Sequence, residues 1–125
     1  MNPADDDCFR EPGSRYEREE PVAVAVVDAT AVVDWSDSAH SPASTLWLPE
    51  TLFQQLAGAT RLREVDVDKQ TRLTSRECQV LAAELAQLET AAPDPDVRRA
   101  AALVRARVEF VASSAGDRSL LVEGP

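Results

Sequence analysis

The sequence is poor in the residues that build disulfide frameworks, metal centres and catalytic sites, with two cysteines and one histidine among 125 residues. Cys8 and Cys78 are too few for a disulfide scaffold, so we expect two free thiols. His40 lies in a small-residue, polar loop without a second ligand at short spacing, which is more typical of a surface residue than of a site. The sequence also contains no glycine-rich phosphate loop and no nucleophile elbow. We therefore expect a protein that is not an enzyme and has no cofactor.

Long hydrophobic runs and net positive charge are also missing. No apolar stretch approaches the ~20 residues that cross a bilayer, and the N-terminus carries acids where a signal peptide has basic residues. We therefore expect a cytoplasmic location. A formal net charge of -9 argues against nucleic acid or an anionic membrane as a direct partner, because both would be repelled. The acidity fits either simple solubility or a surface built for a basic partner.

The length suits one domain. Residues 1–20 hold seven acids and three arginines with little to bury, which predicts a disordered, solvated acidic tail ahead of a domain over residues 21–125. The run Val22–Val27 (VAVAVV) is typical of a buried strand. A turn at residues 28–30 and a second apolar run, Ala31–Trp35, then favour a β-hairpin.

Three helices are expected. Pro49 suits the first turn of a short helix that Gly58 would end, and residues 62–67 are expected to be extended. Thr74 and Glu77 have capping-box spacing, ahead of an apolar stripe formed by Cys78, Leu81, Leu85 and Leu88. After the breaker residues 92–96, the apolar residues of Val97–Val111 recur at helical spacing and predict the longest helix.

Ser119–Glu123 is a short apolar strand that we expect to pair with Val22–Val27. The two long helices are joined by a short loop, which predicts an antiparallel helical hairpin on one face of the sheet. The predicted fold class is therefore α+β, a small antiparallel or mixed sheet packed on a helical hairpin. The arginines of the last helix (Arg98, Arg99, Arg105 and Arg107) are expected to balance carboxylates on a solvated face.

One loop has the spacing of a calcium site. Asp66, Asp68, Gln70 and Glu77 occupy positions 1, 3, 5 and 12 of an EF-hand loop. Position 6, where such a loop turns on glycine, is Thr71, whose branched side chain makes a left-handed backbone costly. A capping box explains Glu77 without any ion, so a single EF-hand-like calcium-binding module is the alternative hypothesis.

The C-terminal half also resembles a group of small, mostly uncharacterised actinobacterial proteins. The shared pattern is an Ile/Val-Asp pair, a threonine five residues later, a Thr/Asn helix cap, a Gln/Glu, a leucine-rich helix, a second helix and a short apolar strand. Here these features are Val65-Asp66, Thr71, Thr74, Glu77, residues 81–88, Val97–Val111 and residues 120–124. The resemblance implies a compact, non-enzymatic α+β domain similar to immunity proteins that neutralise polymorphic toxins.

The leading hypothesis is thus a binding protein that inhibits or chaperones a protein partner such as a basic toxin domain, with acidic residues steering and aromatic residues anchoring it. A regulatory subunit of a larger complex is a further alternative. Trp35 and Trp47 flank a polar loop, and each is expected to be either a core residue or a contact residue for the partner. The candidate partner-binding residues are Asp34, Trp35, Asp37, Trp47, Glu64, Asp66 and Asp68.

Overall fold

A computed structural model describes residues 9, 12–37, 42 and 45–124 of the chain. Within them it contains four strands, three α-helices and a 3₁₀ helix, in the order β1 (Pro21–Asp28), β2 (Thr45–Pro49), α1 (Glu50–Ala59), η2 (Arg61–Glu64), β3 (Thr71–Leu73), α2 (Ser75–Ala91), α3 (Pro95–Ala112) and β4 (Arg118–Glu123). The strands form one antiparallel sheet of order β2-β1-β4-β3. The predicted α+β class is confirmed.

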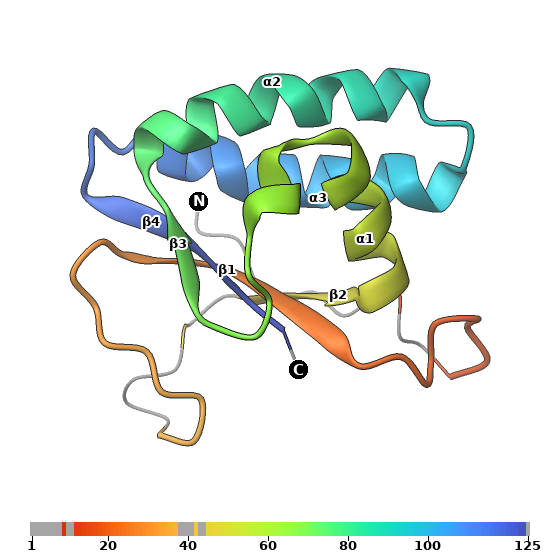
Figure 1. Cartoon of the computed structure of the whole chain (residues 1–125), viewed down its shortest axis with the longest axis horizontal. Helices are drawn as coiled ribbons and strands as arrows, with labels where there is room; N and C mark the ends of the chain where they lie inside the picture. The colour runs from red at the N-terminus through yellow and green to blue at the C-terminus, as the bar shows by residue number, and fades with distance from the viewer. Residues whose placement is uncertain (1–8, 10–11, 38–41, 43–44, 125) are drawn as a thin grey trace.

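The helices lie together on one face of the sheet, with α2 and α3 side by side (Figure 1). Side chains alternate between the two faces of a strand, so Val22 and Val24 of β1 point into the helical core. Leu46 and Leu48 of β2 and Leu120 and Val122 of β4 do the same, each at most 1% exposed. We call this side of the sheet the helical face and the opposite side the open face.

Both long helices begin at the capping residues that the sequence predicts. The Thr74 hydroxyl accepts from the N–H of Glu77 (3.2 Å) and the Glu77 carboxylate accepts from the N–H of Thr74 (3.2 Å), which completes the capping box. Asp94 caps α3 by accepting from the N–H of Asp96 at 2.8 Å, and Pro95 occupies the first turn. The predicted pairing of β4 with β1 is confirmed, with Val24 opposite Val122.

The predicted hairpin is wrong. Ala31–Trp35 is not a strand, although the turn after β1 exists, with the N–H of Ala31 donating to Asp28 O at 3.0 Å. The antiparallel neighbour of β1 is instead β2, which ends at the residue where a helix was expected to begin. Residues 61–64 are a 3₁₀ helix rather than extended chain, and β3 follows where no strand was expected.

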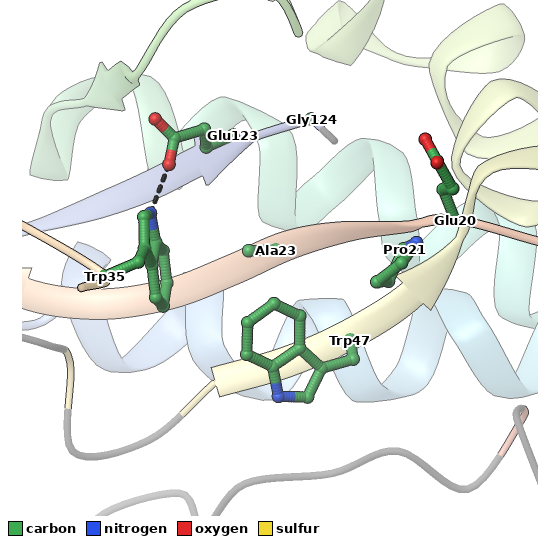
Figure 2. A pocket seen from close by; sticks show the side chains of 7 residues that line it. All are labelled: Glu20, Pro21, Ala23, Trp35, Trp47, Glu123 and Gly124. Atoms are coloured by element: carbon green, nitrogen blue, oxygen red, sulfur yellow. Dashed lines mark hydrogen bonds between the residues drawn. The ribbon is translucent and has the colours of Figure 1, made fainter.

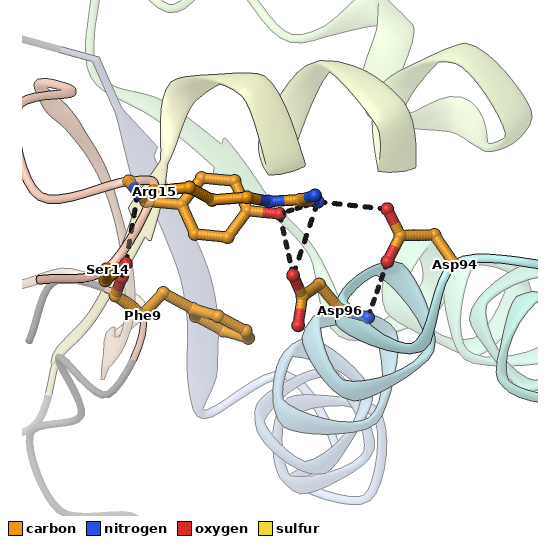
Figure 3. Close-up of polar contacts among 6 residues, drawn as sticks. Phe9, Ser14, Arg15, Asp94 and Asp96 are labelled. Atoms are coloured by element: carbon orange, nitrogen blue, oxygen red, sulfur yellow. Dashed lines mark hydrogen bonds and ion pairs between the residues drawn. The ribbon is translucent and has the colours of Figure 1, made fainter.

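The chain ahead of β1 also differs from the expected solvated tail. Phe9 and Tyr16 are only 4% and 5% exposed and belong to the core on the helical face. Arg15 forms ion pairs with Asp94 (3.1 Å) and Asp96 (3.3 Å), and the Tyr16 hydroxyl donates to Asp96 at 2.9 Å (Figure 3). The N–H of Asp96, and then Arg15, lower the pKa of Asp94. Two aromatic side chains and these polar contacts fix this segment to the start of α3.

The arginines of α3 take two different roles. Arg105 pairs with Glu89 of α2 and with Glu109 (2.9 Å), as the charge-balance prediction expects, and links the two long helices. Arg107 was expected on the solvated face, but it is only 3% exposed. It lies on the side of α3 that also carries the buried Val104 and Val111, so its position on the helix decides its burial.

Candidate binding site on the open face

The alternation of β1 places small side chains on the open face. Val22 and Val24 point to the helices, while Ala23 and Ala25 point the other way. Ala23 lies between Trp47 of β2 and Glu123 of β4 in the cross-strand register. Residues directly opposite on antiparallel strands bring their side chains together. The register therefore places a tryptophan and a carboxylate on either side of a methyl group.

One part of this face is covered by residues 29–37, which we call the covering loop. Val33 buries against Ala25, Val27 and Leu121 in a small cluster separate from the main core. The guanidinium of Arg72 donates to the carbonyl oxygens of Ala29 and Ala31, and Gln70 Nε2 donates to Val33 O at 3.1 Å. These bonds from β3 and the residue before it hold the loop across the sheet.

The covering loop ends at a second tryptophan. Trp35 contacts Trp47, with ring centroids 5.5 Å apart and the planes tilted by 54°. Its indole N–H donates to the carboxylate of Glu123 (Figure 2). Both tryptophans are half-buried and lie on the open face, outside the main core, and Trp35 packs against the smaller cluster around Val33.

Beside the tryptophan pair is a cavity of about 390 Å³. Ala23 lies on β1 between the side chains of Trp35 and Trp47, and Pro21 and Glu20 continue along the same strand and its start (Figure 2). The cavity is lined by Glu20, Pro21, Ala23, Trp35, Trp47, Glu123 and Gly124. Its lining is thus mainly apolar with two carboxylates, the composition of a site that takes an apolar group carrying positive charge.

Two of the seven sequence-predicted residues, Trp35 and Trp47, line the cavity. Asp34 and Asp37 lie on the covering loop beside Trp35, where Asp34 Oδ1 also accepts from the N–H of Ser36 at 3.0 Å. Those two carboxylates therefore add negative charge near the cavity without lining it. His40 is outside the described residues.

The other three predicted residues lie in the segment that joins α1 to β3. Glu64 is exposed at the end of η2, and Asp66 and Asp68 are exposed on either side of Val67. The carbonyl of Val67 accepts from the N–H of Gly124 at 2.8 Å, so this loop meets the cavity lining at one residue. None of the three carboxylates lines the cavity.

The calcium-loop alternative does not match the geometry. Thr71 is the first residue of β3, and the Glu77 carboxylate is occupied by the capping box. Asp66 Oδ1 accepts from the N–H of Asp68 at 3.0 Å, and Gln70 reaches the covering loop instead of an ion. Over residues 9, 12–37, 42 and 45–124, no three His, Cys, Asp or Glu side chains cluster as metal ligands.

Glu20, Pro21, Ala23, Glu123 and Gly124 are the lining residues that the sequence interpretation missed. The alternation of valine and alanine in β1 was a signal for one crowded and one roomy face. Trp47 and Glu123 could be placed at the cavity only with the strand register, because both lie opposite Ala23 although they are distant from it in the sequence.

Cys78 plays no part in this site. The thiol is fully buried in α2 among the core residues, and its burial raises the pKa to about 12. A thiol held in its protonated form is a poor nucleophile.

No helix in the part of the chain that the structure describes is long and apolar enough to cross a membrane. The chain matches no protein-family model, no curated protein and no solved structure.

Proposed function

We propose that the chain is a non-enzymatic protein-binding domain that holds a basic protein partner against its open face, in the manner of an immunity protein that neutralises a toxin by direct binding. The observation that carries the proposal is the half-buried Trp35–Trp47 pair beside an apolar cavity. Tryptophan is enriched among the residues that dominate binding energy at protein interfaces, and such residues work best where surrounding contacts exclude water.

The charge of the chain supports a basic partner. Glu20 and Glu123 line the cavity, Asp34 and Asp37 lie on the adjacent loop, and the whole chain carries a formal charge of -9. Complementary charge speeds encounter and selects against acidic partners. A toxin that acts on a polyanion such as nucleic acid would carry the opposite charge, which is the reason for the basic-toxin form of the proposal.

The position of the cavity adds a structural reason. The helical face of the sheet is filled by core residues, so a partner that binds the sheet would contact the open face. Two exposed hydrophobic side chains, Val32 on the covering loop (73% exposed) and Val80 on α2 (45%), lie on different elements. Val32 is close in sequence to Trp35 and extends the apolar surface of the loop.

The test is capture of a partner from the native host by the immobilised full chain. We expect wild type to retain a basic protein that elutes as salt is raised, because exposed charge pairs weaken with ionic strength. Trp47→Ala should lose it, whereas Val80→Ala, which shortens an exposed apolar side chain on α2, should retain it.

The retained protein is then purified and assayed alone and with one equivalent of the chain. Inhibition by wild type and not by Trp47→Ala supports the immunity function. A partner that binds both variants equally would contradict the proposal, and one retained without any inhibition would favour a subunit of a larger complex.

A further inference from the structure

The open-face cavity combines three features in one place. Trp35 and Trp47 present aromatic rings, Pro21 and Ala23 present aliphatic surface, and Glu123 presents a carboxylate beside Trp35 (Figure 2). Glu20 lines the end of the cavity next to Pro21. Aromatic faces attract cations through the ring quadrupole, most strongly for tryptophan. A purely apolar ligand would make no use of the Glu123 charge, and a small inorganic cation would make no use of the apolar lining.

We propose that this cavity receives an arginine side chain of the protein partner, with the methylene stem on Pro21 and Ala23 and the guanidinium against the tryptophan rings and the Glu123 carboxylate. This inference rests on the proposed function, since it assumes a protein partner at the open face. It adds the chemical identity of the group that is recognised.

Glu123 is the carboxylate best placed for this role. It lies at the end of β4, next to Ala23 in the strand register, and the Trp35 indole N–H donates to its Oε2. That bond holds the carboxylate beside the rings. Within residues 9, 12–37, 42 and 45–124, no hydrogen bond to Oε1 is found, so this oxygen is available to a guanidinium N–H.

Guanidinium fits these features better than the ammonium of lysine. It is planar, stacks on aromatic faces and is more weakly hydrated than an ammonium, so it is transferred more easily into a half-buried apolar site. It also presents several N–H donors in one plane, which allows it to bond Glu123 while its face lies on a ring. A cavity of about 390 Å³ lies within the ~300–1,000 Å³ typical of ligand sites.

The experiment titrates the full chain, with its tryptophans labelled with ¹⁵N, with acetyl-glycyl-arginyl-glycine amide. The matched probe replaces arginine with citrulline, which keeps the shape and removes the charge, and a third probe carries lysine. We expect the arginine peptide to shift the indole N–H signals of both Trp35 and Trp47, with saturation in the millimolar range. The citrulline and lysine peptides should bind at least tenfold more weakly.

Three variants identify the contacts. Glu123→Gln keeps an oxygen acceptor for the Trp35 indole and removes the charge, and it should weaken arginine binding tenfold or more. Ala23→Val adds two methyl groups between Trp47 and Glu123 and should also reduce binding. Glu109→Gln removes a carboxylate from α3, on the helical side of the sheet, and should bind like wild type.

The outcomes separate this inference from the proposed function. The arginine inference is overturned by absent indole shifts at saturating peptide, by equal binding of arginine and citrulline, or by equal binding of arginine and lysine. In each case the partner capture still decides whether the open face binds a protein. Conversely, arginine binding without any Trp47-dependent protein partner would leave the cavity specificity standing and overturn the proposed function.

Discussion

The two faces of the sheet use the same four strands for different purposes. On the helical face, leucine and valine side chains of β1, β2 and β4 pack against three helices and are almost fully buried. On the open face, the alanines of β1 alternate with those valines, and residues 29–37 cover part of the surface. The helical face therefore holds most of the buried apolar core, while the open face combines a small buried cluster with a half-buried tryptophan pair beside a cavity.

The largest expected effect is on the helical face. Leu48 of β2 is 0% exposed in the main core, so Leu48→Ala removes buried methyl groups and leaves a cavity. We expect a loss of about 2–5 kcal/mol in the free energy of unfolding, measured by urea denaturation. A loss below about 1 kcal/mol would mean that this face collapses around the change and is not the tightly packed side.

Gly124 lines the open-face cavity directly after β4 and also contacts Val67 in the loop after η2. A Cβ at this position would lie 2.5 Å from the carbonyl oxygen of Val67 and 2.8 Å from its Cβ. Gly124→Ala must therefore displace the Val67 backbone, and we expect a loss of roughly 1–3 kcal/mol, the usual range for overpacking. Calorimetry tests this, with Gly58→Ala, which meets no atom within 4 Å, as the control.

The capping box at the start of α2 gives a smaller effect. Thr74→Ala removes the acceptor for the N–H of Glu77 and should cost about 1 kcal/mol. Glu77→Gln keeps an oxygen that can accept from the N–H of Thr74, so it should cost clearly less. Both variants are compared by thermal unfolding with and without added calcium. A calcium-dependent rise in melting temperature that Glu77→Gln abolishes would restore the EF-hand alternative.

The smallest expected effect concerns the segment ahead of β1. Asp94→Asn keeps an N-cap acceptor for α3 and removes the charge that pairs with Arg15. The folded-state pKa of Asp94 is lowered from its ordinary 3.8, so its contribution is present above that value and is lost as pH falls through the lower folded pKa. Wild type should therefore lose more stability than the variant between pH 5 and pH 2, measured by urea unfolding at each pH.

Local sequence signals predicted the elements whose causes are local. The capping box at Thr74 and Glu77, the helical spacing of Val97–Val111 and the apolar run Val22–Val27 all gave the observed elements. β4 was also predicted to pair with β1, since it is the only apolar run after the last helix.

The identity of the second strand beside β1 could not be predicted locally, because two segments, Ala31–Trp35 and Thr45–Pro49, could have paired with it. Ala31–Trp35 is as apolar and β-branched as a strand, but its residues serve as a cover, while Thr45–Pro49 pairs with β1 because Leu46 and Leu48 fill the core. The cavity could not be predicted from the sequence for the same reason. Its walls come from β1, β2, β4 and the covering loop, and only the register brings Trp47, Ala23 and Glu123 into one row.

The most direct test of the division between the two faces uses adjacent residues of β2 that point to opposite sides of the sheet. Trp47→Ala and Leu48→Ala are each measured for unfolding free energy and for retention of the captured basic partner. We expect Trp47→Ala to weaken partner binding by tenfold or more at a stability cost of roughly 1 kcal/mol, well below the cost of Leu48→Ala. Undiminished partner binding by Trp47→Ala, or a loss of stability equal to that of Leu48→Ala, would contradict this expectation.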